Sequence, residues 1–294
     1  MFLRCKVRTF WPKLSVVQSR LNASNASSLP RSCVESGMNL PTIFDPVSYT
    51  GELEEGARAA HWTVRYLSPT ESGPRPWLRR ILPERETAPP RLYLSAGIHG
   101  DEISGPLALL EMIRQPGFFA GFDVMMFPIL NPNGLARGVR TNWDEIDLNR
   151  DYRALKSREI ASHVETLVTL GRFDAAMMLH EDYEGIGAYI YELNDTLDPR
   201  LGEKVIAAMG LHVPIDMRPE IEEAAALGGV ISRRDLIAKL GPIEERPEWA
   251  EAIYLLVHHT DAAYTTETPK PFPIEARVKA QIAAVETVMS ALKT

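Results

Sequence analysis

The stretch RLYLSAGIHGDE, residues 91–102, decides the fold. Its first part is apolar and predicts a buried β-strand, while its last part gathers a His, an Asp and a Glu around two glycines. Residues 103–115 (ISGPLALLEMIRQ) then have the apolar spacing of a helix. A strand that ends in polar residues and continues into a helix is typical of α/β sheets, which build their sites at the carboxyl ends of strands.

The same alternation continues on both sides of this stretch. Strands are predicted at residues 61–67, 77–82, 122–130, 173–179, 187–193 and 262–267, and further helices at about 154–170, 197–209, 247–258 and 274–292. The first two strands could form a hairpin across a turn rich in Pro and Gly. Short strands that alternate with helices predict an α/β fold with a mixed, largely parallel sheet.

Charge separates the chain into two segments. Residues 1–37 hold six basic residues and one acid, about +5, whereas the other 257 residues carry about −12. We expect no nucleic-acid binding from so acidic a body, because phosphate contacts need clustered Lys and Arg. No run approaches 18 apolar residues, and both cysteines (Cys5 and Cys33) lie in the basic segment. These features exclude a membrane-spanning helix and a disulfide scaffold in the body.

The first 37 residues are rich in Arg and Ser and nearly free of acids, a composition that resembles a transit peptide. We interpret residues 1–37 as a disordered basic extension, either a targeting segment or the result of a misassigned start, with Met38 as the true first residue. Residues 38–294 are long enough to form a single catalytic domain around one core. We expect a cytoplasmic protein, or one in an organelle or exported if the extension is a genuine targeting segment.

The first polar cluster contains two candidate metal ligands. His99 and Glu102 lie three residues apart, just after the predicted strand. Gly97 and Gly100 allow a tight bend, so both side chains can turn toward one point. Imidazole and carboxylate bind zinc, and two His with one Glu form a known catalytic set that leaves a position for water.

Two later strands also end in residues that can do chemistry. His180 follows the apolar strand at 173–179 and is a plausible third metal ligand, although a hydrogen-bonded core His is the alternative. Glu267 ends the apolar strand at 262–267, where a carboxylate is costly unless it is paired or functional.

Between these clusters lies a segment rich in arginine. The turn signal NPNG at 131–134 is followed by Arg137, Arg140 and the pair Asn149-Arg150. Such an Asn-Arg pair can hold a carboxylate, because Arg offers a planar fork of donors and Asn an amide donor.

In this order, HGDE, NPNG, DLNR, a strand-end His and a late strand-end Glu resemble the zinc carboxypeptidase family, the M14 metallopeptidases. The resemblance covers about residues 90–290 and includes the succinylglutamate desuccinylase/aspartoacylase-like branch. It implies a three-layer fold with a twisted, mixed, largely parallel sheet flanked by helices. It also implies one zinc ion per chain, bound by His99, Glu102 and His180.

The family pattern implies roles for the other side chains as well. Glu267 would be the general base that takes a proton from a metal-activated water. Arg140, or its near neighbour Arg137, would polarise the scissile carbonyl and stabilise the oxyanion. Asn149 and Arg150 would hold the substrate carboxylate and so position the bond to be cut.

The sequence departs from the family in two places. Residues 181–183 (EDY) follow His180, where peptidases of the family usually have a small hydroxyl residue and an aromatic one. The mobile tyrosine of the family has no obvious counterpart, with Tyr254 and Tyr264 as candidates. We interpret the acids at 181, 182 and 184 as a solvated loop or as a site for a substrate ammonium group. The acids at 220, 222 and 223 are interpreted as an exposed helix start.

Three functions are consistent with these residues. The first is a zinc-dependent metallocarboxypeptidase that hydrolyses an amide bond next to a free carboxylate. The second is an N-acyl amino acid deacylase of the succinylglutamate desuccinylase/aspartoacylase type, and the third is a non-catalytic binding module. The arginine-rich loop and the long segment 181–262 favour the peptidase. The substrate would be a peptide or N-acyl amino acid with a free carboxylate, bound in a cleft that we expect to be locally positive. Sequence does not indicate an oligomeric state.

Overall fold

The computed structural model describes residues 44–80, 82, 88–194, 201–242 and 245–293, which belong to one compact unit, Ile43–Thr294. The predicted extension at residues 1–37 lies outside the described residues. The strands are β1 (Thr63–Tyr66), β2 (Pro76–Arg80), β3 (Arg91–Ala96), β4 (Asp123–Phe127), β5 (Ala175–Asp182), β6 (Tyr189–Asn194), β7 (Glu220–Ile221), β8 (Ala224–Ala225), β9 (Val230–Ser232) and β10 (Ala262–Pro269). The helices are α1 (Pro46–Ala59), α2 (Ser104–Arg114), α3 (Pro132–Arg137), α4 (Arg158–Leu167), α5 (Leu201–Met209), α6 (Arg233–Leu240), α7 (Glu251–His258), α8 (Ile274–Leu292) and the 3-10 turn η1 (Leu148–Arg150).

One eight-stranded sheet organises these elements, in the order β1-β2-β4-β3-β5-β10-β6-β9. The pairs β4–β3, β3–β5, β5–β10 and β6–β9 are parallel. The pairs β1–β2, β2–β4 and β10–β6 are antiparallel. The predicted mixed, largely parallel sheet is confirmed, and the hairpin expected from residues 61–67 and 77–82 is β1–β2.

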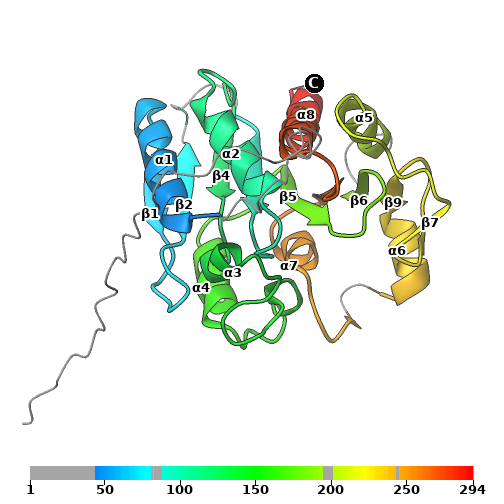
Figure 1. Ribbon diagram of the computed structural model, residues 1–294, viewed down its shortest axis with the longest axis horizontal. Helices are drawn as coiled ribbons and strands as arrows, with labels where there is room; N and C mark the ends of the chain where they lie inside the picture. The colour runs from blue at the N-terminus through cyan, green and yellow to red at the C-terminus, as the bar shows by residue number, and fades with distance from the viewer. Residues whose placement is uncertain (1–43, 81, 83–87, 195–200, 243–244, 294) are drawn as a thin grey trace, which may run out of the picture. The chain divides into compact units, whose positions relative to one another are not determined.

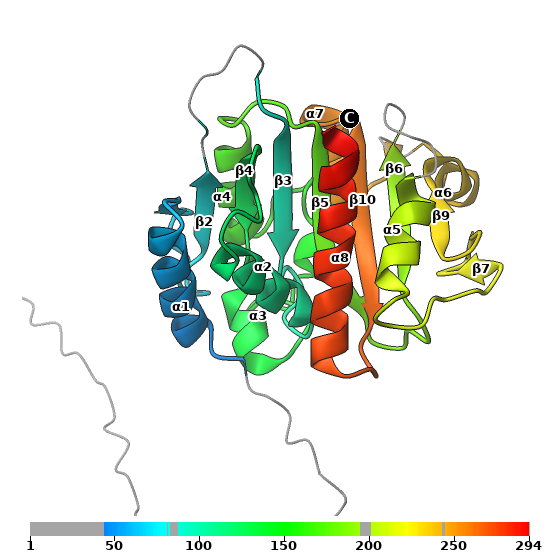
Figure 2. The same cartoon turned by 90° about the horizontal axis from the view of Figure 1, so that it is seen from above.

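Helices cover both faces of the sheet, which gives three layers (Figure 1). Because neighbouring side chains of a strand point to opposite faces, β3 serves both cores. Leu92 and Leu94 join the core beneath α1, α2, α5 and α8. Tyr93 joins the second core, beneath α4 and α7. Figure 2 shows α8 lying along β5 and β10, the central strands that carry His180 and Glu267.

The structure corrects two local predictions. Strand β5 continues to Asp182, three residues beyond the predicted end, because β10 pairs with it through the register Pro269↔Asp182. His180 therefore lies within the strand. Residues 220–225 form the small β7–β8 hairpin instead of a helix start. Glu222 and Glu223 form its turn with φ values of 51° and 58°, a left-handed conformation that no helix start uses.

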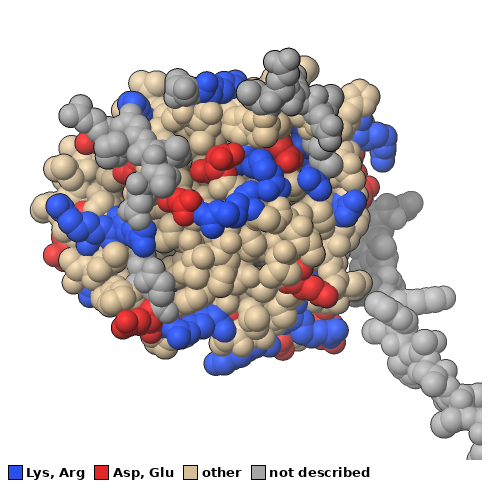
Figure 3. All heavy atoms as spheres, turned by 180° about the vertical axis from the view of Figure 1, so that it is seen from behind, with Lys and Arg blue, Asp and Glu red and all other residues tan. Residues whose placement is uncertain are grey.

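The surface carries charged side chains of both signs. On the face shown in Figure 3, Lys and Arg side chains lie beside Asp and Glu side chains instead of forming one continuous basic area. Within the ranges that the structure describes, no helix has the length and apolar character to cross a membrane.

Candidate metal centre and substrate cleft

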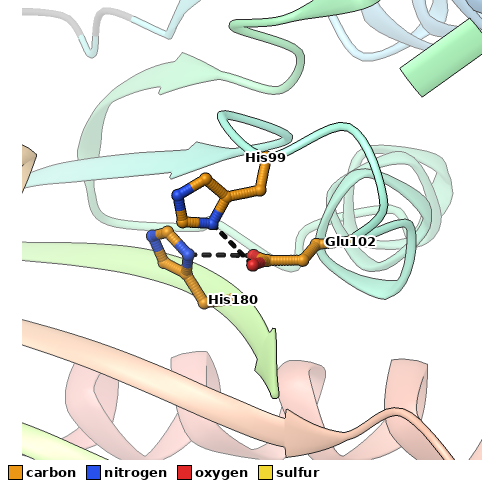
Figure 4. A group of neighbouring side chains, drawn as sticks. All are labelled: His99, Glu102 and His180. Carbon is orange, nitrogen blue, oxygen red and sulfur yellow. Dashed lines mark hydrogen bonds and ion pairs between the residues drawn. The ribbon is translucent and has the colours of Figure 1, made fainter. Parts of the chain in front are cut away.

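The three predicted metal ligands come together at one edge of the sheet (Figure 4). His99 Nδ1 lies 2.6 Å from Glu102 Oε1, and His180 Nδ1 lies 2.9 Å from Glu102 Oε2. All three side chains are buried, and their candidate ligand atoms lie within 4.8 Å of one another. Two imidazole nitrogens and one carboxylate therefore converge on a point where a cation could bind.

Local backbone packing explains the glycines of this loop. Gly97 takes φ +62° as the chain leaves β3, which turns the following residues over the strand end. At Gly100 a Cβ atom would lie 1.9 Å from the carbonyl carbon of Gly134, so only glycine allows this loop to approach α3 so closely. Asn131 caps α3 by accepting a hydrogen bond from Gly134 N at 2.9 Å. The NPNG motif is therefore the start of helix α3, and it packs against the loop that carries His99 and Glu102.

The charges of the cluster suit a divalent cation. Burial alone would raise the pKa of Glu102, but His99 and His180 hold it well below its usual value. Burial would lower the pKa of His99, yet Glu102 and Asp147 raise it. The carboxylates of Glu102 and Asp147 therefore favour a positive charge at this point, which a bound zinc ion could supply. His, His and Glu are also a ligand set found in catalytic zinc sites.

Asp147 has a role in this cluster that sequence reasoning missed. Its Oδ1 lies 3.3 Å from His99 Nε2, and its Oδ2 accepts from Arg140 Nε at 3.0 Å. A carboxylate on the second nitrogen of a ligand His fixes the ring orientation and strengthens metal binding. Asp147 is the first residue of the DLNR motif. Because a metal-binding His usually needs a carboxylate or carbonyl partner on its second nitrogen, the sequence could have suggested this role.

The two candidate arginines lie in different places. Arg140 lines the cleft beside the metal cluster, with Nη1 3.8 Å from Glu102 Oε1. Arg137 is directed to Asn133 and Asn142, and its guanidinium stacks over the ring of Trp143 at 5.4 Å. Arg137 is not among the cleft residues, so the structure brings Arg140 to the site and leaves Arg137 outside it.

The Asn149-Arg150 pair also lines the cleft. Asn149 Oδ1 accepts a hydrogen bond from Glu251 N at 2.9 Å, which leaves the amide nitrogen as the group that can donate to a substrate. Arg150 is exposed and its Nη1 donates to Asn149 O at 2.8 Å. The cleft wall formed by η1 thus offers neighbouring amide and guanidinium donors.

Glu267 reaches the same cleft from β10. It is the register partner of His180 on one side and of Tyr189 on the other. Burial raises the pKa of Glu267 to about 8, with His180 opposing the shift and Glu102 adding to it. A carboxylate held in a partly dry site beside the metal cluster is suited to accept a proton during a reaction.

The cleft has a volume of about 390 Å³ and is more acidic than expected. Its described lining contains seven carboxylates and four basic side chains. The carboxylates are Asp101, Glu102, Glu181, Asp182, Glu222, Glu248 and Glu267, and the basic residues are Arg140, Arg150, Lys239 and Arg246. The prediction of a locally positive cleft is wrong, because Asp182 at the end of β5 and Glu222 in the β7–β8 turn add carboxylates to the lining.

Tyrosines line the cleft, but they are not the two candidates for the mobile tyrosine of the family. Tyr254 is 7% exposed and packs on Tyr152, and Tyr264 is fully buried in the core. Tyr183, Tyr189 and Tyr191 line the cleft instead. A larger cavity of about 560 Å³ lies between α1 and α2 and contains none of the predicted site residues.

Comparisons with known proteins agree with this architecture. Residues 88–227 match the family model of the succinylglutamate desuccinylase/aspartoacylase catalytic domain. Among curated proteins, none matches the chain. The fold is similar to that of a proposed metallopeptidase from Shewanella denitrificans OS217, with 22% identity and a TM-score of 0.70 over 85% of this chain and 92% of that one.

Two other solved structures show the same fold. A proposed metallopeptidase from Shewanella amazonensis SB2B is 24% identical, with a TM-score of 0.71 over 84% of this chain and 93% of that one. A metallo-carboxypeptidase from Burkholderia cenocepacia is 15% identical, with a TM-score of 0.62 over 85% of this chain and 69% of that one.

The family match over residues 88–227, together with the candidate metal ligands at the carboxyl ends of β3 and β5, indicates a hydrolase-like protein. The resemblance to the zinc carboxypeptidases, with their succinylglutamate desuccinylase/aspartoacylase-like branch, is confirmed by the family match and the shared fold.

Proposed function

We propose that this protein is a zinc-dependent metallocarboxypeptidase, which hydrolyses an amide bond next to a free carboxylate. One observation carries the proposal: the cluster of His99, Glu102 and His180 opens into the cleft that Glu267 and the Asn149-Arg150 pair also line. Metal ligands, a base and a carboxylate binder in one cavity are the parts that this reaction needs.

His99, Glu102 and His180 would hold zinc, which supplies a Lewis acid and a water of lowered pKa when bound. Glu267 would accept a proton from the attacking water and later donate it to the leaving amine. Arg140, beside Glu102, would stabilise the negative charge that develops on the carbonyl oxygen. Asp147 would keep the His99 ring and the Arg140 guanidinium in place, since it binds both.

Asn149 and Arg150 would select substrates that end in a carboxylate. The amide nitrogen of Asn149 and the guanidinium of Arg150 can donate to the two oxygens of one carboxylate. Fixing this group also positions the neighbouring amide bond, and such positioning contributes to rate as well as to selectivity.

The main alternative is an N-acyl amino acid deacylase of the succinylglutamate desuccinylase/aspartoacylase type. It would use the same residues, and the family match over residues 88–227 favours it. The carboxylates of Asp182 and Glu222 in the cleft favour the peptidase, because they fit a substrate that also carries an ammonium group. An N-acyl acid would bring only negative charge to these side chains.

A matched substrate panel tests the proposal. Zinc-loaded protein is offered short peptides with a free C-terminus, the same peptides with a C-terminal amide, and N-acyl amino acids. We expect release of the C-terminal residue from the free peptides, and about 10- to 100-fold slower cleavage of the amides because they lose charge-assisted hydrogen bonds. Turnover restricted to N-acyl amino acids would establish the deacylase, and no turnover of any class would favour a binding module.

A further inference from the structure

We infer that Glu181, which is held in place by its buried ion pair with Arg277 of the C-terminal helix α8, positions the metal ligand Glu102 and so raises the metal affinity of the site. This inference rests on the proposed function only in taking the cluster to bind zinc. Glu181 occupies the position after His180 at which the sequence departs from the family pattern. The proposed mechanism uses neither Glu181 nor Arg277 as a metal ligand or a base.

Glu181 holds the segment from Glu102 to Ser104 at two points. Its backbone N–H donates to Glu102 Oε2 at 3.2 Å, so it binds the ligand carboxylate directly. Its own carboxylate accepts from Ser104 N at 2.9 Å, two residues beyond Glu102. The short link between the metal ligand and the first turn of α2 is therefore attached to β5 at both ends.

The side chain of Glu181 is fully buried, and Arg277 supplies the positive charge that compensates its carboxylate. A buried carboxylate without a partner is strongly destabilising, because it has lost its hydration and gained no compensating charge. Arg277 forms an ion pair with Glu181 and is itself only 9% exposed in its side chain. Its Nε donates to Phe272 O at 2.8 Å, which fixes the guanidinium at the start of α8.

A second contact from α8 reaches the neighbouring residue of β5. Gln281, one turn after Arg277, donates through Nε2 to His180 O at 2.8 Å and accepts from Thr266 Oγ1 at 2.6 Å. Helix α8 thus binds two consecutive residues of β5, of which one is a metal ligand and the other holds a second ligand. Figure 2 shows the helix lying along β5 and β10, where these contacts form.

Two double variants of the full-length chain both lack the ion pair and differ in whether residue 181 can still accept the hydrogen bond from Ser104 N. Glu181→Gln/Arg277→Met removes both charges but keeps an oxygen that can accept from Ser104 N. Glu181→Ala/Arg277→Met removes both charges and that acceptor. The zinc dissociation constant of each is measured by competition with a chelator, below the melting temperature of every variant. We expect the Ala variant to bind zinc about 10- to 100-fold more weakly than the Gln variant, the range seen when outer-shell partners of metal ligands are lost.

Arg75→Met is the matched control for general loss of stability. Arg75 is a buried arginine bound to Glu159 O at 2.8 Å and Ser162 Oγ at 2.7 Å, and it touches none of the site residues. It is expected to lower the melting temperature and leave the zinc dissociation constant unchanged. Equal zinc affinity of the two double variants would overturn the inference and leave the proposed function standing. The same holds if Arg75→Met weakens zinc binding, relative to wild type, as much as the Ala double variant does. Failure of the wild-type chain to bind zinc would overturn both.

Discussion

Replacing Glu267 by glutamine is expected to lower kcat by about 10²- to 10⁴-fold, the usual contribution of a general base. Glutamine keeps the size of the side chain but cannot take a proton from water. Glu267 lies beside the metal cluster through its register with His180 and forms none of the cluster's ligand contacts. Zinc affinity should therefore stay unchanged, and steady-state kinetics together with a zinc titration check both parts.

Glu222→Gln is the matched control for this change. Glu222 also lines the cleft, but it lies on the exposed turn of the β7–β8 hairpin. Its replacement should leave kcat near the wild-type value and act mainly on KM for substrates with a free amine. A Glu267→Gln protein that hydrolyses at the full rate would show that another group is the base.

Replacing Arg150 by alanine is expected to lower kcat/KM by about 10- to 100-fold for substrates with a free terminal carboxylate, because hydrogen bonds between charged groups contribute roughly 1.5–3 kcal/mol. The effect should be small for the same peptides with a C-terminal amide, which have no carboxylate to bind. Comparing both substrates with both proteins isolates the pairing of Arg150 with the carboxylate.

Arg137→Ala provides the control, because Arg137 belongs to the same arginine-rich segment as Arg150 but is not among the residues that line the cleft. Arg137 is bound to Asn133 and stacks on Trp143 outside the cleft. Its removal should affect neither substrate series. An Arg137→Ala defect that depends on the substrate carboxylate, with Arg150→Ala unaffected, would contradict the assignment.

The parts of the site that sequence could predict are those encoded locally. His99 and Glu102 lie within one short loop after a strand, and His180 and Glu267 were found because each ends an apolar run. Parallel strands bring their carboxyl ends to one edge, so local patterns were enough to place these four side chains together. The fold class followed from the same alternation of strands and helices.

Other features depend on pairing between distant segments, which local patterns do not show. Strand β5 gains its last three residues from pairing with β10, and Asp147 becomes a partner of His99 across 48 positions. The acidic character of the cleft arises in part because the β7–β8 turn brings Glu222 to the site from a distant part of the sequence. Helix α6 escaped prediction for another reason: it has no fully buried residue and so no clear apolar face.

The zinc content of the purified protein tests the central claim most directly. Wild-type protein and a His180→Ala variant are each equilibrated with zinc, freed of unbound metal and assayed for zinc per chain. We expect one zinc per wild-type chain, and a greatly reduced content in the variant, because a site with two remaining ligands binds the metal weakly. A wild-type protein that retains no zinc, or a variant that retains as much as wild type, would contradict the assignment of His99, Glu102 and His180 as the metal site.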